Sequence, residues 1–162
     1  MVGLVPLILT VHNAEEAVAF HRMWPRLDAL LPQPFASAEA RLSVSAMIQA
    51  LAVLSLLGCL LAAGVLLRPQ WKTGWWLLLA LESAMGINVI AHVVSALLVF
   101  RGYGPGLVTA LVLNAPFAGY FLARARREQW VSERAWRASF VGGAVLHGPV
   151  LLGGLWLFSA LA

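Results

Sequence analysis

Apolar residues follow one another along the chain in five long blocks, separated by short polar stretches that are rich in Arg, Pro and Gly. Four of the blocks are clear and the first is compromised by polar residues, but each is close to the roughly 20 residues that an α-helix needs to cross the hydrocarbon of a bilayer. The pattern therefore predicts an all-α integral membrane bundle of five segments, over residues 3–20, 42–67, 75–100, 105–123 and 138–161. The sequence contains neither repeats nor low-complexity tracts, so we expect residues 1–162 to form a single transmembrane helical domain.

Composition supports a membrane protein. Hydrophobic residues make up 61% of the chain and charged residues only 11%, whereas a soluble domain carries about 25% charged residues. The formal charge of +4 does not indicate a nucleic-acid partner, because the basic residues lie at the ends of the apolar blocks, as in membrane proteins. A single cysteine, Cys59, provides neither a disulfide nor a metal framework.

The basic residues between the blocks predict an orientation. One side of the predicted bundle carries Arg68, Lys72, Arg124, Arg126, Arg127, Arg134 and Arg137, and the other carries Arg22, Arg26, Arg41 and Arg101. The side richer in Lys and Arg is normally cytoplasmic. We therefore expect a protein of the cell (inner) membrane with its N-terminus in the cytoplasm and its C-terminus outside. The first connector is the polar segment 21–41.

The first apolar block is interrupted by the polar motif His12-Asn13-Ala14-Glu15-Glu16. A charged side chain at the centre of a bilayer costs about 2.5–3.5 kcal/mol even on lenient scales, and such residues usually mark function. At about 100° per residue, Glu15 lies about 60° to one side of His12 and Glu16 about 40° to the other. All three side chains therefore leave the helix from one face.

Three other blocks also carry polar residues near their middle. They are Asn88 and His92 in the third block, Asn114 in the fourth and His147 in the fifth. These residues are predicted to share one depth with His12, as a buried site between facing helices requires. Gly143 and Gly154 lie on the same helical face as His147, where small residues allow a neighbouring helix to approach closely.

Two prolines follow these polar residues, in Asn114-Ala115-Pro116 and His147-Gly148-Pro149. Each proline removes a backbone donor and frees the carbonyl four residues earlier. In a membrane such a carbonyl is tolerated only where another group satisfies it. The prolines predict either a polar cavity at this depth or plain helix kinks, and both remain open here.

Glu82 is a further carboxylate in the third block. It lies about 120° from Asn88 around the helix and nearer the expected cytoplasmic end. We expect it to pair with Lys72 or with a basic residue of another connector.

Three ordered motifs resemble those of the HXXEE-domain family of small bacterial and archaeal membrane proteins. The motifs are His12-x-x-Glu15-Glu16, Asn88-x-x-x-His92 and Tyr103-x-Pro105-Gly106-x-x-Thr109, and the resemblance extends from His12 to at least Pro116. It implies that the important residues are His12, Glu15, Glu16, Asn88, His92, Pro105, Gly106 and Thr109. The family is defined by its motif, so the resemblance implies no activity. His147 and Asn114 are added here from their depth and helical face.

The candidate residues favour a metal site. Three imidazoles with one or two carboxylates suit Zn²⁺ or Fe²⁺. The predicted ligands are His12, Glu16, His92 and His147. Glu15 is expected to act as a general base or to support the ligands from outside, and Asn88 to orient His92 or a substrate. Because Glu15 is three residues from His12, it could also chelate with His12, so Glu15 and Glu16 could exchange these two roles. Asn114 and Thr109 are predicted to contact the substrate.

We therefore expect a metal-dependent membrane enzyme, most simply a hydrolase, that acts on a lipid-like or other apolar small molecule. A metal-free acid–base lipid isomerase or transferase stays open, because paired His and Glu side chains can exchange protons. Proton- or cation-coupled transport also stays open, and a transporter this small would need to form a homo-oligomer. The fourth reading is a polar cluster that only fixes helix packing, where each hydrogen bond contributes about 0.6 kcal/mol.

Overall fold

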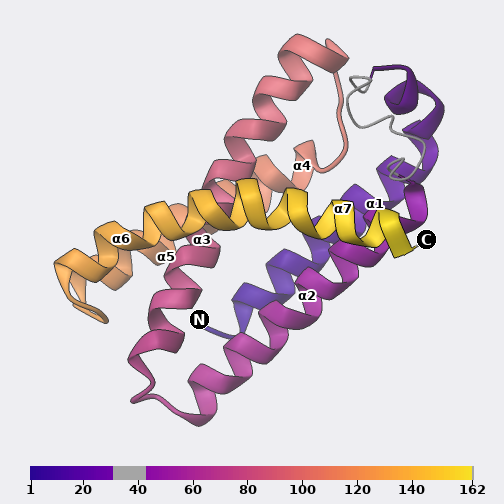
Figure 1. Cartoon of the computed structure of the whole chain (residues 1–162). Helices are drawn as coiled ribbons and strands as arrows, with labels where there is room; N and C mark the ends of the chain where they lie inside the picture. The colour runs from indigo at the N-terminus through magenta and orange to yellow at the C-terminus, as the bar shows by residue number, and fades with distance from the viewer. Residues whose placement is uncertain (31–42, 162) are drawn as a thin grey trace.

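The computed structural model describes residues 1–30 and 43–161, and the regular structure in these residues is entirely helical (Figure 1). Five helices follow one another, three of which contain a π-helical turn. They are α1 (Leu4–Leu30); α2 (Val44–Leu67); α3 (Lys72–Ser95) with the turn η2 (Ala96–Phe100); α4 (Leu107–Thr109), η3 (Ala110–Asn114) and α5 (Ala115–Arg127); and α6 (Glu133–Val145), η4 (Leu146–Val150) and α7 (Leu151–Leu161). The predicted all-α bundle of five segments is confirmed.

Four of the five helices in the described residues are long and apolar enough to cross a membrane. They are Val44–Leu67, Lys72–Phe100, Leu107–Arg127 and Glu133–Phe158. Their outer faces expose large apolar side chains, among them Leu97 and Leu98, as a surface that faces lipid would. These lengths and this composition indicate a membrane protein. The remaining helix, α1, is the one that carries the polar motif.

Several helices extend beyond the ends predicted from hydropathy. α1 continues ten residues past Phe20 and contains Pro25, and residues 31–41 of the predicted first connector lie outside the described residues. α6 begins at Glu133, because the Ser132 hydroxyl caps it by accepting a hydrogen bond from the Ala135 N–H at 3.2 Å. Hydropathy detects the apolar stretch of a helix, whereas capping and helix propensity also extend the helix into polar sequence.

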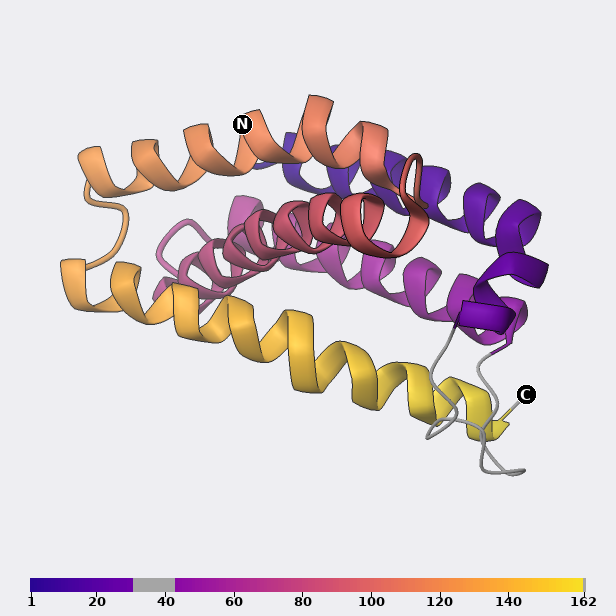
Figure 2. The same ribbon diagram turned by 90° about the horizontal axis from the view of Figure 1, so that it is seen from above.

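The central helix is α3, which contacts α2, α5 and α6, while α1 packs along α2. Viewed from above, the α6–η4–α7 helix lies along one side of the bundle and α5 along the opposite side (Figure 2). A buried apolar cluster that includes Val5, Leu78 and Phe121 fills one end. The rings of Phe121 and Trp130 close this end, with centroids 5.2 Å apart.

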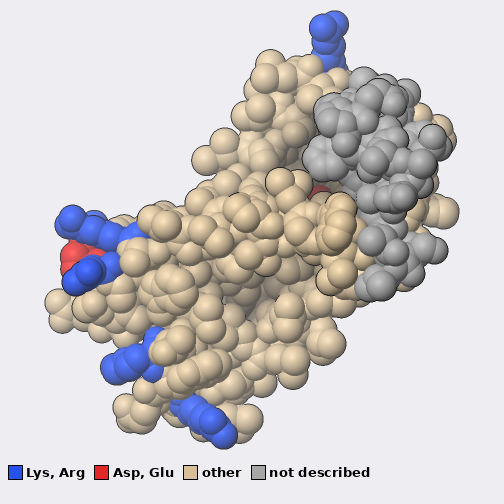
Figure 3. All heavy atoms as spheres, in the orientation of Figure 1, with Lys and Arg blue, Asp and Glu red and all other residues tan. Residues whose placement is uncertain are grey.

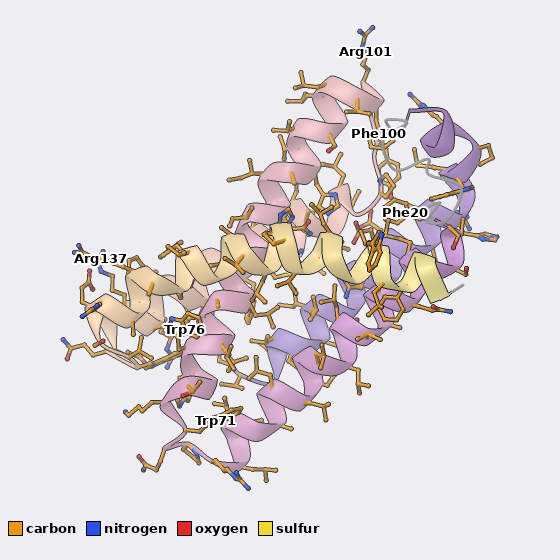
Figure 4. All side chains as sticks on the ribbon, viewed as in Figure 1. Phe20, Trp71, Trp76, Phe100, Arg101 and Arg137 are labelled. Carbon is orange, nitrogen blue, oxygen red and sulfur yellow. The ribbon has the colours of Figure 1, made fainter. Side chains whose placement is uncertain are left out.

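The two ends of the molecule differ in character. Trp71, Trp76 and Arg137 lie at the end opposite Phe100 and Arg101 (Figure 4). On the visible face the Lys and Arg side chains gather at the extremities, and the middle is apolar except for an acidic side chain visible in a hollow (Figure 3). The middle of this face is therefore largely apolar, as a surface that faces lipid would be.

Both prolines that follow a candidate site residue adjoin a π-helical turn. η3 ends at Asn114, two residues before Pro116, and η4 contains both His147 and Pro149. A π-turn is rare and is often found at functional sites. The predicted disturbance of the helices at these prolines is therefore present in both cases.

Candidate metal centre

Side chains from two helices converge to form a group of three possible ligands. His12 and Glu16 come from α1 and His92 from α3, and one donor atom from each lies within 4.8 Å of the others. The Nε2 atom of His12 is 3.8 Å from one Glu16 oxygen, and the Nε2 atom of His92 is 3.9 Å from the other. Ligands of a tetrahedral zinc ion lie about 3.4 Å apart, so a small closure of this group would suit a cation.

His92 presents an available nitrogen to this group. Its Nε2 atom is buried and has no hydrogen-bond partner among the described residues. Buried polar atoms are nearly always paired in proteins, which makes this atom a candidate ligand. The His12 and His92 rings meet edge to face with their centroids 5.1 Å apart, so the two imidazoles are held together by packing.

A chain of hydrogen bonds runs through five side chains and includes His12. His147 Nε2 is 3.1 Å from Asn88 Oδ1, and Asn88 Nδ2 is 2.8 Å from His12 Nε2. His12 Nδ1 is 2.8 Å from the Thr109 hydroxyl, which donates to Glu15. Since the Thr109 proton goes to a carboxylate, its oxygen must accept from His12. His12 therefore carries its proton on Nδ1, and its Nε2 lone pair faces Asn88 and Glu16.

Glu15 caps the start of α4 from another helix. Its carboxylate accepts hydrogen bonds from the Tyr103 hydroxyl at 2.8 Å, the Val108 N–H at 3.3 Å and the Thr109 N–H at 2.8 Å, besides the Thr109 hydroxyl. The first N–H groups of a helix have no partner within the helix and favour a negative charge. The two adjacent glutamates therefore have different surroundings: Glu16 faces the imidazoles, and Glu15 joins α1 to α4.

The structure sorts the predicted site residues into three groups. His12, Glu16 and His92 lie together. Asn88, Thr109, Glu15 and His147 surround them through the hydrogen-bond chain. Asn114 is 1% exposed, and neither its amide nitrogen nor its amide oxygen has a partner within residues 1–30 and 43–161. The roles predicted for these residues stay predictions.

Gly106 and Tyr103 have contacts that the sequence did not reveal. A methyl group placed on Gly106 would lie 2.7 Å from His92 Cε1 and 2.9 Å from His12 Cε1. The Tyr103 hydroxyl donates a hydrogen bond to Glu15. The feature of the sequence that pointed to both residues was their place in the third motif, Tyr103-x-Pro105-Gly106-x-x-Thr109.

An apolar cavity of about 280 Å³ adjoins the group of three ligands. α1, α2, α3, η4 and α7 all contribute to its wall. Its polar lining residues are Asn13, Glu16, Asn88 and His147, and the remaining ones are apolar. The cavity therefore meets the candidate site at Glu16, Asn88 and His147.

Glu82 lies apart from this site, in α3. It is 3% exposed, and no ion pair or hydrogen bond joins it to another described residue. The expected ion pair with Lys72 or with a basic residue of another connector is therefore not formed among the described residues. Glu82 is a second buried carboxylate, separate from the His-containing group.

Tyr103, in the turn between α3 and α4, is expected to lose its hydroxyl proton only at an unusually high pH. Burial and its hydrogen bond to Glu15 raise the pKa of Tyr103 to about 12. The neutral phenol is the donor, so this contact is fully present below pH 10 and is lost as the pH rises through about 12. A Tyr120→Phe variant leaves Tyr103 as the single tyrosine of the chain, and its phenolate absorbance can then be followed. A midpoint near 10, the ordinary value, would contradict this assignment.

Comparison with known proteins agrees with the motifs in the site. Residues 3–121 match the family described as "Protein of unknown function with HXXEE motif". The chain belongs to the HXXEE family. All three grouped ligands lie within the matched HXXEE region, whereas His147 lies beyond it.

The HXXEE protein is also similar to the "Uncharacterized protein YrkK" of Bacillus subtilis (strain 168), with 32% identity over 108 residues. The match covers 67% of this chain and 63% of the relative, so it spans less than two thirds of the relative's length. No solved structure matches the chain.

Proposed function

We propose that this HXXEE protein is a membrane-embedded, metal-dependent enzyme, in which His12, Glu16 and His92 hold a divalent zinc or iron ion. The observation that carries the proposal is the convergence of their donor atoms within 4.8 Å. Two imidazoles with one carboxylate are the ligand set of several catalytic zinc sites and of the non-haem iron oxygenases. Such a set leaves coordination positions open for water and substrate.

The surroundings of His12 support metal binding. Imidazole ligands usually donate their second N–H to a fixed acceptor, which sets the tautomer and makes the ligand atom more basic. Thr109, itself held by Glu15, is that acceptor for His12 Nδ1. The Nε2 lone pair is consequently directed toward the group that contains Glu16 and His92.

Hydrolysis is the reaction we propose, on a lipid-like or other apolar substrate. A bound divalent metal would polarise a substrate carbonyl and make water more acidic. Asn88 bonds the same His12 nitrogen at 2.8 Å, so metal binding would release its amide to orient substrate or water. The adjoining apolar cavity supports an apolar substrate, and Glu15, which positions His12 through Thr109, stays our candidate for a general base.

Transport of protons or cations is the second candidate function. The hydrogen-bond chain from His147 to Glu15 links the cavity to the turn that contains Tyr103. Its middle member, Asn88, is an amide, however, and an amide neither gains nor loses a proton readily. This series of hydrogen bonds is therefore better suited to fixing the tautomers of the imidazoles than to conducting protons.

For the cellular setting we propose the inner membrane, with the N-terminus in the cytoplasm. This proposal rests on the seven basic residues at the ends of α2, α3, α5 and α6, against the four that the sequence places on the other side. The partners we expect are lipid or another apolar small molecule, and no nucleic acid.

Metal analysis of purified protein tests the proposal. After growth with added zinc and iron, wild-type protein should carry close to one metal ion per chain, and the His12→Ala and His92→Ala variants should lose it. The loss in affinity should exceed the roughly 10–100-fold that follows removal of an outer partner of a ligand. His21→Ala is the matched control, because His21 is exposed on the same helix as His12. Wild-type protein that stays metal-free would overturn the proposal.

A further inference from the structure

We propose that the cavity beside α7 binds the hydrocarbon chain of a single-chain amphiphile whose carbonyl group lies against Glu16, Asn88 and His147. The inference rests on the proposed function in taking this amphiphile as the substrate. Binding itself can be measured whether or not a metal is present.

The lining of the cavity separates a polar end from an apolar wall. Of its four polar residues, Asn13 already uses both hydrogens of its amide nitrogen, which donates to the Leu51 carbonyl at 3.1 Å and to the Ser55 hydroxyl at 2.9 Å. The other three lie where the cavity meets the metal centre. A hydrocarbon chain along the rest of the wall would leave no polar group newly unpaired.

The volume of the cavity fits a single alkyl chain. Its volume is about 280 Å³. A cavity of about 150 Å³ binds one benzene molecule with its six carbon atoms, so this cavity holds a chain of about eleven carbon atoms. This length corresponds to one medium-length alkyl chain and leaves no room for the two chains of a phospholipid.

The polar end offers a hydrogen-bond donor to a carbonyl oxygen. The Asn88 amide nitrogen has two hydrogens, and its one hydrogen bond in the described residues is to His12. The Asn88 oxygen is already engaged by His147, which fixes the amide so that the second hydrogen is available. A carbonyl oxygen accepts such a bond, and a carbonyl is the group on which the proposed hydrolysis acts. An ester, amide or fatty acid is therefore favoured.

α7 is the wall through which the chain reaches the cavity. A methyl group placed on Gly148, Gly153 or Gly154 would meet no atom within 4 Å in the described part of the chain. These glycines are thus not required for close packing, and together with Pro149 in the π-turn they make the helix easy to bend. Because α7 contacts mainly α2, a small outward bend opens the cavity toward lipid.

Photolabelling in lipid nanodiscs tests the inference. The probe is dodecanoic acid with a diazirine at the end of its chain, and the labelled positions are found by peptide mass spectrometry. We expect labels on cavity residues such as Met85 and Leu151, and removal of these labels by excess unlabelled dodecanoic acid. Leu54→Trp, which fills the cavity, should lower this labelling about tenfold, the change that 1.4 kcal/mol produces.

Leu56→Trp is the matched control, because Leu56 is 58% exposed on the same helix. Met85→Trp fills the cavity from α3, and it replaces Leu54→Trp in the test if that variant does not fold. The inference fails if labelling is spread over outward-facing residues without saturation. It also fails if a diacyl phospholipid probe labels the cavity equally or if Leu54→Trp behaves like Leu56→Trp.

The metal content of the same wild-type preparation separates the two proposals. Bound metal without saturable labelling of the cavity overturns the amphiphile site and leaves the metal enzyme standing. Saturable labelling without bound metal supports the amphiphile site and overturns the metal enzyme.

Discussion

A Gly106→Ala variant is expected to lose both the metal centre and a large part of its stability. Gly106 has a φ of +74°, in the left-handed region, which costs other residues about 1–3 kcal/mol. An alanine methyl would also lie 2.7 Å from His92 Cε1 and 2.9 Å from His12 Cε1. Overpacking of this kind costs about 1–3 kcal/mol more, or displaces the rings. Displaced imidazoles could no longer offer their Nε2 atoms to one cation.

Gly119→Ala is the matched control for this substitution, in the membrane-spanning helix that begins directly after Gly106. A methyl group on Gly119 would meet no described atom within 4 Å, and its φ is ordinary. This control should equal the wild type or exceed its stability by up to about 1 kcal/mol. Thermal unfolding in detergent and metal content after purification are the two measurements. A Gly106→Ala protein with wild-type values of both would show that the loop tolerates a side chain at the imidazoles.

The convergence of His12, Glu16 and His92 follows from features that the sequence contains. His12 and Glu16 are four residues apart on one helix, so they share a face. His92 lies near the middle of another long apolar block, at the same depth. Burial of polar residues in lipid forces such faces inward. For these reasons the donor group could be predicted without knowledge of which helices are neighbours.

The different positions of Glu15 and Glu16, one at the start of α4 and the other beside the imidazoles, could not be predicted. Both lie within about 60° of His12 around the helix, so their spacing does not distinguish them. The distinction arises from the α4 N-terminus, whose Val108 and Thr109 N–H groups meet Glu15. That contact joins residues more than 90 positions apart and depends on the tertiary packing of the turn before α4.

In the fifth helix, too, the contacts with neighbouring helices could not be predicted from the sequence. Gly143 and Gly154 share the face of His147 in the sequence, and both were expected to allow close helix packing. Only Gly143 does so in the described residues, because Gly154 has no neighbour within 4 Å of an added methyl group. His147 likewise reaches Asn88 and not the grouped ligands. A helical face can be predicted from sequence, but the point at which a neighbouring helix crosses it cannot.

A Gly143→Ala variant is expected to force α3 and α6 apart. The added methyl would lie 2.6 Å from Ser83 Cβ, 2.7 Å from the Ala84 nitrogen and 2.8 Å from the Ser83 carbonyl carbon. Two of these three atoms belong to the backbone, which cannot rotate away as a side chain can. We therefore expect a loss of about 1–3 kcal/mol, visible as a lower melting temperature.

The same substitution should separate the cavity from the metal centre. His147 lies one turn beyond Gly143, so moving α6 lengthens the 3.1 Å contact between His147 and Asn88 and alters the cavity wall. His12, Glu16 and His92 come from α1 and α3, and metal content should therefore stay near the wild-type value while saturable photolabelling falls. Gly119→Ala again serves as the control, since an added methyl there meets no described atom within 4 Å and Gly119 does not line the cavity. Equal loss of metal and labelling in Gly143→Ala would mean that the two parts of the site are not separable.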